Sequence, residues 1–482
     1  MISIIECLIW IAASIGIGCC LVELCAARSC ERLGALGLAL GFGLGVGSSA
    51  CLYFISLLIF GGASLAFVWM NLALLTVLLI LRVLLYRNGG VRTPSPPSPF
   101  QYRDALIPIL AITAVVFILT VFLRSSTFIH GGWDAWTFWN LRARWIFRSG
   151  ADWPASVFSP LLANTDYPLL LPSTTVQAWN LLGTETVYVP VSIGIAFELG
   201  TVALLLAVLW RFSSPMKSIL GMLLLMATPL FIDLGAYQYG DVPIAYFFLS
   251  TLTLIGLHDS AASDRKEWLA LAGFAAGLCC WTKNEGMLFA GSVIIARIFT
   301  ARLSGWRNLA KELLYIVVGA GVPVAVLFYF RHAYAPPSVM FGSQTVRGFI
   351  SQIFEAPRHA MILRAFIRSV IGFGGFGNWK ISPLPFMAIY AAVAGFNKNQ
   401  RYSRFLSTCL VSLLLMLAGY YAVYLTEGIP AAKLQQHLDT SLDRLMFQLW
   451  PMFILTYFLA VRNPLPQENV AHSQPSPESW PA

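Results

Sequence analysis

Residues 130–150 read HGGWDAWTFWNLRARWIFRSG and follow a long apolar segment, 105–123. The stretch opens on two glycines and places one acid, Asp134, at the foot of an expected helix. A basic, tryptophan-rich amphipathic helix tends to lie in the membrane interface, so we expect Asp134 just above the bilayer. The polar residues that form one face of this helix, by their spacing of three, four and four, are Thr137, Asn140, Arg144 and Arg148.

The composition excludes a soluble protein. Hydrophobic residues make up 58% of the 482 residues and charged residues only 11%, too few charges for a water-exposed surface. Apolar runs long enough to cross a bilayer recur, and they predict an all-α integral membrane bundle of about 13 transmembrane helices. Amphipathic juxtamembrane helices are expected in the first large outer loop. The net charge of +9 does not indicate nucleic acid, because the basic residues lie in short loops where orientation and anionic lipids explain them.

The chain is expected to have four parts. Residues 1–86 form an N-terminal extension of three spans, and residues 87–104 form a Pro-rich cytoplasmic linker that contains TPSPPSP. Residues 105–462 form the main membrane domain, and residues 463–482 form a disordered cytoplasmic tail. Within the main domain, the short apolar stretch 169–182 is expected to be a second interfacial or re-entrant helix.

Polar motifs recur where spans reach the expected outer face, and charged groups at membrane depth usually face a cavity or a partner. There a carboxylate can take a proton from a hydroxyl group, and cations can hold a phosphate. Tryptophan and tyrosine can stack on sugar rings. The residues that this reasoning selects are Trp133, Asp134, Tyr239, Asp241, Lys283, Glu285, His437 and Arg444.

The order of these motifs resembles a family of membrane enzymes. A span leads to an outer loop with an acid, then an amphipathic helix, Tyr-Pro-Leu, Tyr-x-Asp-x-Pro and Thr-Lys-x-x-Gly. This order is similar to that of the GT-C glycosyltransferases, which take sugars from polyprenyl phosphates. They include protein O-mannosyltransferases, aminoarabinose transferases of lipid A and lipopolysaccharide-core transferases. The resemblance covers residues 105–462.

The resemblance implies a role for several residues. Asp134 matches the catalytic acid of the first loop, and Asp241 matches a second acid of the site. Lys283 matches a lysine that contacts the lipid phosphate, and Tyr167 with Pro168 matches the start of the next helix. Many relatives have a paired acid beside the first one, whereas Asp134 is flanked by Trp133 and an alanine. No metal or other cofactor is therefore indicated.

Each residue also has a simpler interpretation. In this interpretation Asp134 and Asp241 are helix caps, and Lys283 extends to lipid headgroups with Glu285 as its partner. His437 and Arg444 then only flank a span. Glu198 lies inside a span. An acid there would suggest a transporter, but we expect Glu198 to pair with another residue within the bundle. A further group, expected to meet lipid headgroups, comprises Arg347, Arg358, Arg364 and Arg368.

The sequence thus predicts a glycosyltransferase of the inner (plasma) membrane. It would move a monosaccharide from a polyprenyl-phosphate donor to a glycolipid, glycan or protein of the envelope at the periplasmic face, with Asp134 as general base. Two alternatives are a lipid or sugar transporter or flippase, and a polymerase or ligase for lipid-linked glycans.

Overall fold

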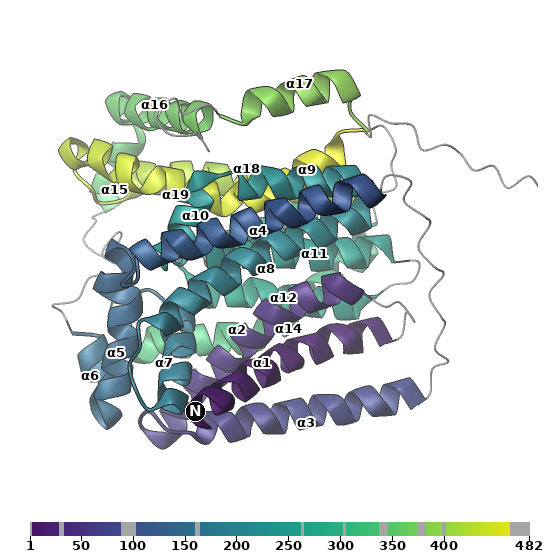
Figure 1. Cartoon of the computed structure of the whole chain (residues 1–482). Helices are drawn as coiled ribbons and strands as arrows, with labels where there is room; N and C mark the ends of the chain where they lie inside the picture. The colour runs from purple at the N-terminus through teal and green to yellow at the C-terminus, as the bar shows by residue number, and fades with distance from the viewer. Residues whose placement is uncertain are drawn as a thin grey trace, which may run out of the picture.

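The structure is a computed structural model of the chain. It describes residues 2–27, 33–87, 103–159, 164–261, 265–301, 305–336, 346–373, 382–397 and 402–462. Most of the expected linker and all of the expected tail lie outside these ranges. The named elements of the described residues are all helices, and most of the long ones run side by side (Figure 1). The short α5 (Asn140–Arg148) and α6 (Trp153–Val157) stand across one end of the bundle.

Eight helices of the described residues are long and apolar enough to cross a membrane, and a pair bent by 59° makes a possible ninth. The chain is therefore a multi-span helical membrane protein. The eight lie within α1 (Ile2–Ala26), α2 (Gly34–Phe60), α3 (Ala66–Arg87), α4 (Arg103–Thr127), α8 (Tyr188–Phe212), α11 (Asp241–Ser260), α14 (Trp306–Ala333) and α18 (Ser403–Thr426), and the bent pair is α9 (Pro215–Met226) with α10 (Pro229–Ala236).

Four of the thirteen expected spans are helices that are not counted among these candidates. Three are too short, with 17, 16 and 11 residues, and the fourth, of 30 residues, carries charged residues in its first half. They are α12 (Lys266–Thr282), α13 (Glu285–Thr300), α17 (Leu384–Ala394) and α19 (Ala431–Ala460). The remaining named helices include α15 (Val346–Ile353) and α16 (Ala356–Gly372).

Helix α11 is the centre of the bundle. Every residue from Asp241 to His258 is buried, so the helix meets protein on all sides. Its Tyr246 hydroxyl donates to the carbonyl of Ala39 in α2 and accepts from the amide of Gly43. Gly43 is required there, because a Cβ atom at this position would lie 2.0 Å from the Tyr246 ring. The first three helices are therefore tied into the main bundle through α2.

The apolar stretch after Tyr167 forms α7 (Leu170–Leu182), a helix of 13 residues. Its first ten residues, Leu170 to Trp179, are all buried. Gln177 accepts a hydrogen bond from Ser49 of α2 at 2.5 Å, and Asn180 donates one to Tyr53 at 3.0 Å. Helix α7 is therefore packed inside the protein against α2.

Candidate functional site

The loop that carries Asp134 is pinned by its two glycines and by Gln238. Gly131 has a φ of +78°, which glycine adopts without strain. The amide of Gly132 donates to the carbonyl of Tyr237 at 2.9 Å. Gln238 donates to the carbonyls of Phe128 and Ile129 and accepts from Asn140 at 2.6 Å. These bonds join the first loop to the turn before α11, so Asp134 and Asp241 lie close together.

The predicted amphipathic helix is correct only in part. Its first turn, Ala135–Trp139, is a π-helix, which adds a residue to the turn and rotates the residues that follow. Asn140, predicted on the polar face, is buried at the start of α5, where it donates to Gln238 at 2.6 Å. Arg144 and Arg148, farther along the same helix, pair with Glu185 at 3.8 and 2.6 Å.

Arg142 was not predicted to have a structural role. It is buried, and it donates to the backbone carbonyls of Asn164 and Tyr167. Arg142 thereby fixes the loop that presents Tyr167 to the site.

Asp241 is the most enclosed charge of the site, with a fully buried side chain. Lys283 Nζ lies 2.9 Å from its Oδ1, and Arg444 Nη2 lies 2.9 Å from its Oδ2. Gln448 also donates to Oδ1, at 2.6 Å. Lys283 in turn lies 2.9 Å from Glu285, as predicted for that pair. Lys283 is itself buried, so it does not extend to headgroups.

Asp134 shares Arg444 with Asp241. Arg444 Nη2 lies 2.5 Å from Asp134 Oδ2, and its guanidinium stacks over the ring of Tyr239 at 4.4 Å. Asp134 makes no capping hydrogen bond to the helix that follows, which removes the simple interpretation. Burial raises the pKa of the Asp134 carboxyl, while the positive charge of Arg444 opposes this rise. The carboxyl therefore titrates closer to neutral pH than an exposed aspartate.

All nine residues selected from the sequence line one cavity of about 880 Å³, a size typical of small-molecule sites. They come from the first loop, the turn before α11, the α12–α13 turn and α19. Trp133 is 72% exposed, whereas Tyr167 packs on Phe138 with ring centroids 5.5 Å apart. The structure thus brings together every predicted site residue.

Further polar residues of this cavity were missed by the sequence reasoning. Arg331, at the end of α14, donates to Asn284 at 2.7 Å, and Asn284 donates to Asp166 at 2.8 Å. Glu427 is buried beside His437, whose Nε2 lies 3.3 Å from its carboxylate. In the sequence, Arg331 belongs to no motif. Only the packing of distant helices reveals it.

The cavity lining holds more acidic than basic side chains, and its basic side chains differ in whether a carboxylate pairs with them. Two of its three Lys or Arg side chains, Lys283 and Arg444, are already paired with carboxylates. Among the described residues, Arg331 has no carboxylate partner, and its buried Nε has no hydrogen bond. The acidic residues of the lining are Asp134, Asp241, Glu285, Glu427, Asp439 and Asp443.

Comparisons with protein-family models, curated proteins and solved structures give no match to this chain. The case for a function therefore depends on the cavity itself. Among the described residues there is no group of three or more His, Cys, Asp or Glu side chains that could hold a metal ion.

Two predictions outside the cavity are wrong. Arg358 does not meet headgroups: it is buried and donates to the carbonyls of Tyr424, Glu427 and Ile429. Glu198 does not pair within the bundle: it is fully buried in α8, and neither of its carboxylate oxygens has a hydrogen-bond partner in the described part of the chain. It packs where Gly235 leaves room.

Proposed function

We propose that this protein is a GT-C type glycosyltransferase of about thirteen spans, in which the four shorter or more polar helices also cross the membrane. It moves a monosaccharide from a polyprenyl-phosphate donor to an envelope acceptor. The observation that carries the proposal is the meeting of an acid of raised pKa, three cations and several aromatic rings in one cavity. Asp134 is the general base that takes the proton of the acceptor hydroxyl.

The donor phosphate is assigned to Arg331 and Lys283. Arg331 is the cavity arginine without a carboxylate partner among the described residues, so it can bind an anion without breaking an ion pair. A guanidinium binds two phosphate oxygens at once. The acceptor oxygen attacks the sugar C1, the bond from C1 to the phosphate oxygen breaks, and the electron pair stays on the phosphate, where Arg331 and Lys283 offset the charge. Trp133 and Tyr239 offer faces for the sugars.

The proposed orientation places the cavity at the periplasmic face of the inner membrane. The cavity lies at one end of the bundle, because α11 begins there with Asp241. The basic residues Arg265, Lys266 and Lys311 lie at helix ends remote from it. Lysine and arginine are enriched in short loops on the cytoplasmic side of a membrane. The end of the bundle that carries these basic residues therefore faces the cytoplasm.

The test is transfer by the purified full chain in liposomes, with a panel of polyprenyl-phosphate sugars and envelope glycolipid acceptors. We expect Asp134→Asn to abolish transfer, because the amide cannot take a proton, while the protein still folds. Asp152→Asn is the matched control, since Asp152 is an exposed acid of the same loop. Normal transfer by Asp134→Asn would refute the assignment. Movement of lipid or sugar across vesicles that lack any acceptor would instead favour a transporter, and a donor with a diphosphate would favour a polymerase or ligase.

A further inference from the structure

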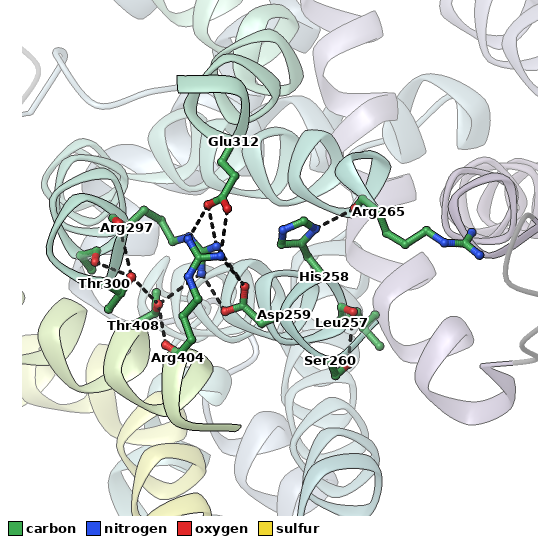
Figure 2. A network of polar contacts seen from close by, with 11 residues as sticks. Leu257, His258, Asp259, Ser260, Arg265, Arg297, Thr300, Glu312, Arg404 and Thr408 are labelled. Atoms are coloured by element: carbon green, nitrogen blue, oxygen red, sulfur yellow. Dashed lines mark hydrogen bonds and ion pairs between the residues drawn. The ribbon is translucent and has the colours of Figure 1, made fainter. Parts of the chain in front are cut away.

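A second set of buried charges lies at the end of the bundle opposite the cavity. Figure 2 shows side chains of four helices converging there: Asp259 of α11, Arg297 of α13, Glu312 of α14 and Arg404 of α18. Arg297 binds both oxygens of Asp259, at 2.7 and 3.0 Å, and reaches Glu312 at 2.7 Å. Arg404 binds both oxygens of Glu312, at 2.9 and 2.7 Å. We call these four residues the far-end cluster.

The far-end cluster is closed and neutral. Two cations face two anions, and Arg404 also approaches Asp259 at 3.5 Å. The exposed fraction of the side chains is 0% for Arg297, 4% for both acids and 15% for Arg404. There is no room for a ligand between charges that already pair with one another, so the cluster is not a second binding site.

The four helices of the far-end cluster also build the cavity. In α11 the two sites are 18 residues apart, or about 27 Å at 1.5 Å per residue, close to the thickness of a hydrocarbon core. The cavity residues at the other ends of these helices are Asp241 of α11, Glu285 of α13, Arg331 of α14, and Tyr420 and Tyr424 of α18.

Stability alone does not account for such a cluster. Taking ions out of water is so unfavourable that a buried ion pair is often no more stabilising than apolar residues of the same size. A forked arginine–carboxylate contact, however, adds two directional hydrogen bonds that constrain the direction and separation of the two helices. Two forked contacts that share acids across four helices fix the helices relative to one another.

We infer that the far-end cluster is a positioning network for the proposed transferase. From the opposite side of the membrane, the cluster holds α11, α13, α14 and α18 in a fixed register. That register brings Asp241, Glu285 and Arg331 together in one cavity. Its four residues touch no substrate. The inference rests on the proposed function, because it assigns to the cluster the geometry of that reaction.

The deciding variant replaces one complete pair, Glu312→Leu with Arg404→Leu. It leaves Arg297 and Asp259 paired, keeps the net charge and fills the space with apolar atoms. We expect the melting temperature to stay close to that of the wild type, while kcat falls by about tenfold to a hundredfold, as for a misplacement of about 1 Å. The pH at which activity rises should also shift, because Asp134 feels the charges of Asp241 and Arg444.

The control removes the ion pair of Glu23 and Arg82, which joins α1 and α3, with the same two leucines. Neither helix lines the cavity, so kcat should not change. Arg404→Lys is a milder variant should the double variant not fold. It keeps the charge but loses the fork, and we expect an intermediate kcat. A folded double variant or Arg404→Lys with the kcat and pH profile of the wild type would overturn the inference.

A second readout does not need activity. Hydrogen exchange of the segment 283–290, which lines the cavity, should become faster in the double variant than in the control. Unchanged exchange there would overturn the positioning role even if the wild type transferred no sugar. If the wild type transferred no sugar but exchange were faster in the double variant, the proposed function would be refuted. The positioning role of the far-end cluster would still be supported.

Discussion

At the scale of single residues, the cavity is governed by how its two central carboxylates share one arginine. Asp241 also accepts hydrogen bonds from Lys283 and Gln448, so both of its carboxylate oxygens are paired. Asp134 has Arg444 as its one ion-pair partner among the described residues, and burial raises its pKa. Carboxylates whose surroundings differ in this way are suited to different roles. Asp134 exchanges a proton, and Asp241 holds the cations in place.

The pH dependence of transfer follows from this pairing. A general base works only when deprotonated, so activity should rise with pH through the pKa of Asp134, above the ordinary value of about 3.9. Arg444 lowers that pKa. Arg444→Gln should therefore move the rise of kcat/KM to higher pH, and Arg444→Lys should move it less. A profile that stays in place, or moves to lower pH, contradicts the role of Asp134.

Arg331 gives a second prediction at this scale. We expect Arg331→Gln to raise the KM for the donor by about tenfold or more, since a charged hydrogen bond contributes roughly 1.5–3 kcal/mol. Arg331→Lys should restore part of the loss, while the KM for the acceptor stays the same. Arg148→Gln is the control, because Arg148 is exposed and pairs with Glu185 instead. An unchanged donor KM in Arg331→Gln would remove Arg331 from the phosphate site.

At the scale of elements, the loop before α5 shows how far sequence reasoning reaches. The glycines and Asp134 stand out in the sequence, and the structure places them where a turn meets the cavity. The π-helix at Ala135–Trp139 could not be predicted, because a period of 3.6 assumes a regular helix. The burial of Asn140 could not be predicted either, because it comes from the contact with Gln238, a residue distant in the sequence. Arg358 was taken for a surface charge and Arg142 was given no role, since no pattern marks a cation that satisfies buried carbonyl groups.

The glycine turn itself can be tested through stability. Gly131→Ala forces a side chain into the left-handed region, which disfavours folding by about 1–2 kcal/mol. The added Cβ would also lie 2.6 Å from Ala135. Gly150→Ala is the control: its φ is also positive, at +53°, but no atom lies within 4 Å of the added group. We expect the melting temperature to fall clearly more for Gly131→Ala. Equal losses would show that the turn is not tightly packed.

At the scale of the whole molecule, α11 links two buried charge clusters across the bundle, and the sequence predicted only one of them. Asp241 was predicted because it lies in a Tyr-x-Asp-x-Pro motif. Asp259 and Arg297 lie at helix ends and resemble ordinary loop charges. Residues such as Arg331 and Glu427 reach the cavity only because α14 packs against α12 and α18 packs against α13, and such tertiary contacts leave no local pattern in the sequence. The membrane class and the residues that meet in the cavity were thus accessible from the sequence, whereas most of the pairing of charges was not.

The most direct measurement is mass spectrometry of envelope glycolipids and glycans from cells that lack the gene. The cells are complemented with the wild type, with Asp134→Asn, or with the Asp152→Asn control. The proposed function predicts that one sugar residue is absent from one acceptor in the deletion strain and in the Asp134→Asn strain. The wild type and Asp152→Asn should both restore that sugar. Identical glycan profiles in all four strains would contradict a glycosyltransferase centred on Asp134.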